Sequence, residues 1–237
     1  MTREVGTTGA ADEQATVDLL WGGRAAATRG PKPALTIERI AEAAVAVADA
    51  EGIDAVSMQR VAESLSFTKM SLYRYVAGKS DLLAVMVEHA VGEPPDTSRR
   101  SGWRARVERW AGQLSASWDE HPWLPGVTTG RRVMGPREIG WVEAGVAALE
   151  GTALTPAERF DVVVLISGHL RNTQSAGVAG TQPWHEGPHA GLIGADPGRF
   201  PALAGLLTAR VRTPRQNRDF GLRCLLDGVA ARLGERS

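Results

Sequence analysis

The sequence has few cysteines and no long apolar run, features that disulfide-bonded and membrane-spanning proteins require. Its one cysteine, Cys224, excludes an internal disulfide, and the leucines around it predict a packed thiol, not a redox sensor or nucleophile. It contains no run of about 20 apolar residues that could cross a bilayer. Its first residues lack the basic and then apolar layout of a secretion signal, so we expect a cytoplasmic protein with no membrane partner.

The chain also has no formal net charge at pH 7. The 27 basic residues are balanced by 27 acidic ones among 237 residues, so the whole chain offers no overall attraction to a polyanion. Basic residues are nevertheless concentrated locally, because residues 60–79 hold four of them and a single acid, Glu63. A second basic stretch, residues 24–32, holds no acid. The distribution of charge therefore permits nucleic-acid binding although the total does not suggest it.

Strand signals are missing, and apolar residues recur instead at helical spacing. Thr36, Ser57 and Thr68 are each placed to cap a short helix, and residues 79–92 predict a fourth. Thr155 begins a capping box that continues with Pro156 and Glu158. We therefore predict an all-α fold without internal repeats, whose longer helices cover residues 103–118, 136–149, 155–176, 200–211 and 215–233, with a loop over 177–198.

Breaks in this pattern divide the chain into three parts. Residues 1–35 are rich in Gly, Ala and Thr, and predict a flexible basic arm with room for a short helix over 12–21. Its segment 29–33 could lie along a DNA minor groove or be only a disordered linker. Residues 36–92 predict a three-helix helix-turn-helix domain, and residues 93–237 a larger helical domain.

The segment after Ser57 carries the most specific pattern. Two short helices are joined by a three-residue turn, and the second ends in Leu-Tyr-Arg-Tyr-Val over 72–76, followed by Lys79 and a Leu-Leu pair. In these features residues 36–91 resemble the DNA-binding domain of the TetR family, the tetracycline-repressor-like regulators. The resemblance implies a transcription regulator, most often a repressor, that a small molecule releases from a double-stranded DNA operator.

The outer face of the third helix supplies the predicted DNA contacts. With Leu72 and Val76 directed inward, basic and polar side chains are left to meet phosphates and base edges in a major groove. Analogy with the tetracycline repressor adds a glutamine of the second helix. Any one of these side chains could instead serve packing or solvation. The predicted DNA-binding residues are Gln59, Thr68, Lys69, Met70, Ser71, Tyr73, Arg74, Tyr75 and Lys79.

The sequence departs from the family pattern at two positions. Ser66 occupies a turn position that is often glycine in this family, and a left-handed backbone at a residue with a Cβ costs about 1–2 kcal/mol. We therefore expect either a strained turn or one of another type. Val76 stands where many members have phenylalanine.

The second domain has tryptophans and a few scattered polar side chains, which suit the apolar walls and polar anchors of a small-molecule pocket. The alternative is that the tryptophans only fill a core. The predicted pocket residues are Trp103, Trp110, Trp118, Trp141, His169 and Asn172. The helices near 155–176 and 215–233 are the predicted homodimer interface, because helix-turn-helix proteins usually pair on DNA; both could instead be internal core.

Enzymatic function is the competing hypothesis. His185 and His189 match a zinc-protease motif, but Gly187 and Pro188 between them oppose the helix that the motif requires, so we predict no catalytic residue, metal or cofactor. A metal-dependent enzyme that uses this loop, and a DNA-binding protein without an effector, remain the two alternatives.

Overall fold

The computed structural model describes residues 7–22, 34–98, 102–174, 187–207 and 213–234. Every regular element in these ranges is a helix, which confirms the all-α prediction. In the same ranges no helix has both the length and the apolar character that crossing a membrane requires. The chain separates into two compact units, residues 1–163 and 164–237, and the boundary falls within one helix.

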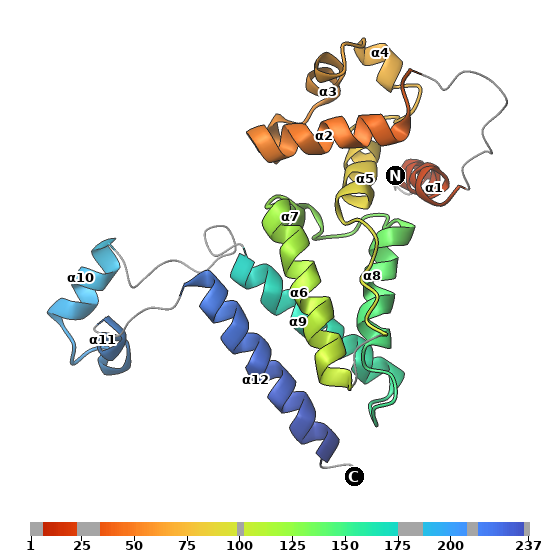
Figure 1. Cartoon of the computed structure of the whole chain (residues 1–237). Helices are drawn as coiled ribbons and strands as arrows, with labels where there is room; N and C mark the ends of the chain where they lie inside the picture. Colours follow the sequence, from red (N-terminus) through yellow and green to blue (C-terminus); the bar gives the residue numbers. More distant parts are fainter. Residues whose placement is uncertain (1–6, 23–33, 99–101, 175–186, 208–212, 235–237) are drawn as a thin grey trace, which may run out of the picture. The chain divides into compact units, whose positions relative to one another are not determined.

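The first unit contains the helix-turn-helix and the helices that support it (Figure 1). Helix α2 (Ile37–Glu51) is followed by Gly52, whose φ of 87° ends the helix. It packs along the helix that follows the helix-turn-helix, and together they bury Ile40, Ala44, Leu82 and Met86 completely. The elements are α2 (Ile37–Glu51), η1 (Ile53–Ala55), α3 (Met58–Ser64), α4 (Lys69–Leu72) and α5 (Lys79–Ala90).

The amino-terminal segment differs from its prediction. Residues Thr7–Trp21 form a helix, α1, that packs against α5, where the sequence predicted a flexible arm with only a short helix. Its order depends on tertiary contacts, because an isolated helix of this length is marginal in water. Thr16 Oγ1 donates a buried 2.7 Å hydrogen bond to Asp81, 65 residues away. The basic segment 29–33 lies outside the described residues.

Two tryptophans, Trp110 and Trp141, pack where α6 (Trp103–Glu120) and α8 (Pro136–Ala147) meet. Trp110 is 2% exposed, and its indole N–H donates to the Trp141 carbonyl at 2.9 Å. The two helices approach closely because Gly145 has no side chain; a Cβ there would lie 2.9 Å from Trp110 Cε2. A short helix, α7 (Leu124–Val127), connects α6 to the loop before α8.

The second unit begins within α9 (Pro156–Gln174) and ends with α12 (Pro214–Gly234). The predicted capping box is present at the start of α9, since Glu158 Oε2 accepts the Thr155 N–H at 2.9 Å and Thr155 Oγ1 accepts the Glu158 N–H at 3.3 Å. Farther along α9, His169 Nε2 donates to the Arg218 carbonyl of α12 at 2.9 Å. This contact fixes α9 against α12.

Two further predictions for the second unit were wrong. Residues Gly187–Ala195 form helix α10, followed by α11 (Pro201–Leu207), where the sequence predicted a loop up to residue 198. Pro188 is tolerated because it falls in the first turn of α10, where its missing N–H breaks no helical bond. Cys224 is exposed, although its leucine neighbours predicted a packed thiol. Adjacent residues of a helix point in different directions, so burial of Leu226 leaves Cys224 outside.

Candidate DNA-binding site

Two side-chain caps shape the helix-turn-helix. Ser57 Oγ accepts the backbone N–H of Arg60 at 3.1 Å at the start of α3, and Thr68 Oγ1 accepts that of Ser71 at 3.3 Å at the start of α4. Both caps agree with the sequence prediction. The α4 segment is only four residues long, but Val76 N–H still donates to the Leu72 carbonyl at 3.1 Å, so the helical path continues into the following turn.

The turn between α3 and α4 takes the strained form, which is one of the two forms that the sequence allowed. Ser66 has a φ of 59°, the only positive φ at a non-glycine residue among the described residues. Its N–H still reaches the Glu63 carbonyl at 3.1 Å, so the left-handed turn closes the end of α3. The serine at this position therefore adopts the strained left-handed backbone, and the turn is not of a different type.

Substituting Ser66 by glycine is expected to raise the free energy of unfolding by about 0.5–1 kcal/mol. Glycine removes a left-handed penalty of about 1–2 kcal/mol, and its greater freedom in the unfolded chain offsets part of this gain. Urea denaturation measures the change. Ser66→Ala is the matched control, because it keeps the Cβ and should not be stabilised. A glycine variant no more stable than the alanine variant would contradict the strained turn.

The exposed face of α4 combines cations, an apolar side chain and a phenol. Met70 is 73% exposed and Tyr73 is 40% exposed, whereas Leu72 between them is fully buried. Lys69 Nζ lies 5.6 Å from the centre of the Tyr73 ring, close enough for a cation–π contact that holds both side chains on the same face. Arg74 is also exposed. This face carries no acid, so it can approach a polyanion.

The remaining predicted residues fall into different settings. Ser71 and Tyr75 are half-buried, and Thr68, besides capping α4, lies 2.9 Å from the Ser71 hydroxyl. Lys79 is exposed at the first position of α5. Gln59 is exposed on α3, where its amide donates to Glu63 Oε1 at 2.7 Å. This bond uses one of the two N–H groups of the Gln59 amide, so a base contact through the other N–H or the carbonyl oxygen does not require it to break.

Arg60 is an exception to the basic patch that the sequence suggested. Its Nε donates to the two carboxylate oxygens of Glu51 at 3.1 and 3.2 Å. The hydrogen bonds from this guanidinium lower the pKa of Glu51. The charge of Arg60 is thus matched within the protein, which leaves Lys69, Arg74 and Lys79 as the cations of the patch.

Asp81 is a structural residue of the site that the sequence analysis missed. It is 7% exposed, and its Oδ2 accepts the N–H of Ala77 at 3.0 Å, directly after the segment that follows α4. Its Oδ1 accepts from Thr16 of α1. An acidic residue in the first turn of a helix was the only local signal, because the Thr16 partner is distant in sequence. Asp81 links α1 and α5 to the end of the recognition segment.

Hydrogen bonds from α8 and from the residue before α7 join the helix-turn-helix domain to the rest of the first unit. Asp49 of α2 accepts the Trp123 indole N–H at 2.7 Å. Trp141 of α8 donates to the Val91 carbonyl at 2.9 Å, after α5. Glu88 of α5 accepts the Arg137 backbone N–H at 2.7 Å, and burial raises the pKa of this carboxyl. The last two of these bonds connect α8 directly to α5 and to the residue that follows it.

The predicted pocket residues are distributed over both units. Trp110, Trp118 and Trp141 are each less than 9% exposed, and Trp103 is half-buried. The predicted polar pair, His169 and Asn172, belongs to the second unit, where His169 is held by α12 and Asn172 is exposed. Their use in binding an effector stays a prediction.

The metal hypothesis gains no support from the described part of the chain. There, no group of three or more His, Cys, Asp or Glu side chains is arranged to hold a metal ion. His189 is exposed in the first turn of α10. His185, the other histidine of the motif, lies outside the described residues.

Comparison with known proteins identifies both halves of the chain. The family model described as "Bacterial regulatory proteins, tetR family" matches residues 33–86, and that described as "Tetracyclin repressor-like, C-terminal domain" matches residues 94–233. The HTH-type transcriptional repressor DrrR1 of Streptomyces coeruleorubidus is 34% identical, over 97% of this chain and 90% of the relative. An HTH-type transcriptional regulator of Saccharopolyspora erythraea is 28% identical, over 86% and 88%.

Solved structures agree with this relationship at the level of the fold. Apo ActR from Streptomyces coelicolor superposes with a TM-score of 0.75 at 24% identity, covering 87% of this chain and all of that one. ActR in complex with actinorhodin gives 0.70 at 23% identity, with 87% and 100% covered. The capped helix-turn-helix, the matched carboxy-terminal domain and the 34%-identical relative together show that this chain belongs to the TetR family of DNA-binding transcriptional regulators.

Proposed function

We propose that this regulator is a homodimeric repressor that binds a palindromic operator and leaves it when a small-molecule effector binds. The acid-free exposed face of α4, with Lys69, Met70, Tyr73 and Arg74, is the observation that carries the proposal. In a helix-turn-helix this face enters the major groove. Lys69, Met70 and Gln59 would read bases, and Tyr73 and Lys79 would hold phosphates. Repression is supported by the relative named as a transcriptional repressor.

The proposed dimer interface lies on exposed apolar faces of α9 and α12. Val164 and Leu165 are 51% and 59% exposed, although Ile166 beside them is buried. On α12, Phe220, Cys224 and Gly228 follow one another at four-residue spacing and are all exposed, so they form one stripe. Two such helices from each of two copies would make a symmetric four-helix interface. The exposed Val164 and Leu165 of α9 would then be buried.

The effector is proposed to bind among the helices of the carboxy-terminal domain. ActR, which shares this fold, has been solved with actinorhodin bound. An effector that shifted α8 would act on α5 through Glu88 and Trp141, and so change the separation of the two recognition segments. A hundredfold release from DNA requires about 2.7 kcal/mol of coupling between the two sites.

Fluorescence anisotropy with the DNA that flanks the gene tests the proposal. A specific operator should bind with a Kd of about 10⁻⁸ M or tighter at physiological salt, and a shuffled duplex of equal length and composition about 10³-fold or more weakly. Equal affinity for the two duplexes would contradict specific operator binding. Small molecules added to the complex then separate an effector-released repressor from an effector-independent protein.

A further inference from the structure

A cavity of about 710 Å³ lies between α1, α2, α5 and the start of α8. This volume falls in the range of about 300–1,000 Å³ typical of small-molecule sites. One of its walls is α1, which precedes both segments that the family models match. The cavity is therefore distinct from a pocket enclosed by the carboxy-terminal helices alone.

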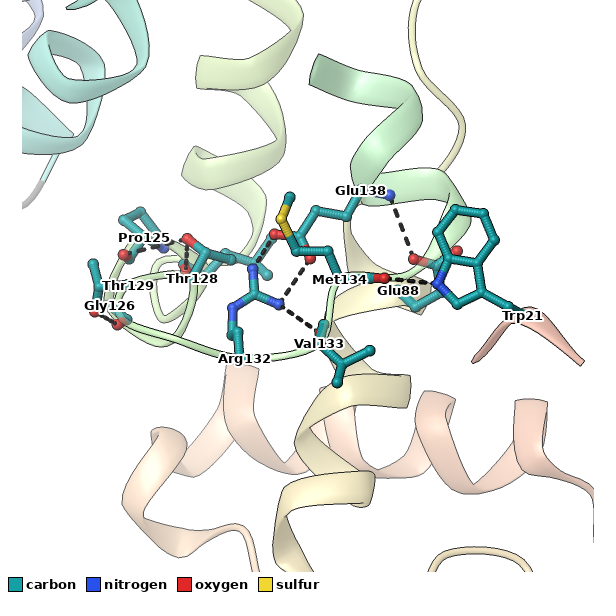
Figure 2. Close-up of polar contacts among 11 residues, drawn as sticks. Trp21, Glu88, Pro125, Gly126, Thr128, Thr129, Arg132, Val133, Met134 and Glu138 are labelled. Carbon is teal, nitrogen blue, oxygen red and sulfur yellow. Dashed lines mark hydrogen bonds and ion pairs between the residues drawn. The ribbon is translucent and has the colours of Figure 1, made fainter. Parts of the chain in front are cut away.

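The α1 wall is held in place at several points. Thr16 is bonded to Asp81 in the buried contact with α5. At the other end of α1, the Trp21 indole donates to the Met134 carbonyl at 2.9 Å, in the loop before α8 (Figure 2). Arg131 of the same loop lies 3.3 Å from Glu13. These contacts fix α1 across α5 and the loop, so the cavity has defined walls.

The lining of the cavity has an apolar part and a charged part. Leu19 and Leu20 of α1 face it together with Ile37 of α2 and Val85 of α5. These side chains can cover a hydrocarbon or aromatic body.

Among the described residues that line the cavity, carboxylates outnumber cations. These residues include Asp18, Glu38, Glu88 and Glu93, one guanidinium, that of Arg137, and the imidazole of His89. Arg137 Nε already donates to Glu93 Oε1 at 2.8 Å. Glu88 accepts the backbone N–H groups of Arg137 and Glu138 at 2.7 and 3.4 Å, and Figure 2 shows the bond from Glu138.

The setting of Glu88 bears on the charge that a ligand would carry. Burial is the main cause that raises the pKa of this carboxyl, and the α8 backbone N–H groups and the charge of Arg137 oppose that shift without cancelling it. A nearby ammonium would favour the ionised form, whereas an anion would add to the repulsion. The charge balance therefore selects positively charged ligands.

We propose that this α1–α5 cavity binds an organic cation, a protonated amine carried on an apolar body, as a site separate from the effector pocket of the carboxy-terminal domain. The amine would lie at the carboxylates around Glu88, and the body against Leu19, Leu20, Ile37 and Val85. The proposal does not depend on repression or on operator release.

Dansylcadaverine is a suitable probe, because it joins a primary amine to an apolar fluorophore whose emission reports burial. We expect it to bind the full-length protein about tenfold more tightly than N-pentyl dansylamide, which has a similar body without the charge. Glu88→Gln keeps an acceptor for the α8 backbone and should remove about tenfold in affinity for the amine only. Asp18→Asn combined with Glu38→Gln, at two exposed positions, should weaken amine binding in the same direction.

Glu42→Gln is the matched control, since Glu42 is exposed on α2 and does not line the cavity. Its affinity for dansylcadaverine should equal that of the unmodified protein. Equal binding of the amine and the neutral amide would overturn the proposal. So would amine binding that survives both the Glu88 and the double substitution, or that falls equally in the Glu42 variant. Operator binding, measured separately, reports on the proposed function and not on this site.

Discussion

The Leu165→Glu variant is expected to be a monomer at micromolar concentration and to bind its operator about 10²–10⁴-fold more weakly than the unmodified protein. In a symmetric interface the substitution occurs twice, so it would bring two carboxylates into an apolar contact. Loss of the dimer removes the gain that comes from linking two recognition segments. Light scattering after size-exclusion chromatography measures the mass, and fluorescence anisotropy measures the affinity.

Leu192→Glu is the control for this experiment. Leu192 is 71% exposed on α10, so it offers the same chemical change in the same unit but outside the α9–α12 faces. It should leave both mass and operator affinity unchanged. Helical content measured by circular dichroism should stay the same in both variants, because each leucine is exposed in the single chain. A Leu165→Glu protein that remains dimeric would place the interface elsewhere.

Lys69→Ala is expected to lower operator affinity by about 30-fold to more than 10⁴-fold. A base-reading contact is worth about 1–3 kcal/mol, and a dimer makes it twice, for about 2–6 kcal/mol in total. Because Lys69 is proposed to read a base, binding to a shuffled duplex should fall much less. Tyr73→Phe removes only a phosphate-directed hydroxyl, so it should weaken both complexes to a similar and smaller extent. Anisotropy titrations on both duplexes measure the four affinities.

Arg109→Ala serves as the control for lost charge. Arg109 is exposed on α6, outside the helix-turn-helix, and its removal changes the net charge as Lys69→Ala does. Operator affinity should be nearly unchanged. The stability of the Lys69 variant should also stay within about 0.5 kcal/mol of the unmodified protein, as is usual for exposed side chains. If Lys69→Ala weakened operator and shuffled duplex equally, Lys69 would be a phosphate contact.

Local sequence signals predicted the elements of the DNA-binding domain well. The caps at Thr36, Ser57 and Thr68 were identifiable because each hydroxyl bonds an N–H three residues farther along the chain. At Ser66 the family pattern allowed a strained left-handed turn or another turn type, and the structure has the first. These features depend on residues a few positions apart, so local sequence patterns are enough to predict them.

Features that depend on distant residues were missed or wrong. Helix α1 is ordered by partners 65 and 113 residues away, which composition could not reveal, and Asp81 was overlooked for the same reason. The sequence placed Arg60 among the basic residues of 60–79, but in the structure its charge is matched by Glu51. Cys224 was assigned to a core because its neighbours in sequence are leucines, yet neighbours on a helix point to different sides.

The sequence by itself determined the helical class, the capped helix-turn-helix and the family resemblance, because periodicity, caps and turn residues act over a few positions. Tertiary structure alone decided which tryptophans are core, which cation is already paired and that α1 forms a wall against α5. It also decided that apolar faces of α9 and α12 remain exposed in one chain. Burial and charge pairing are properties of the packed molecule, since each depends on what the rest of the chain brings to the same place.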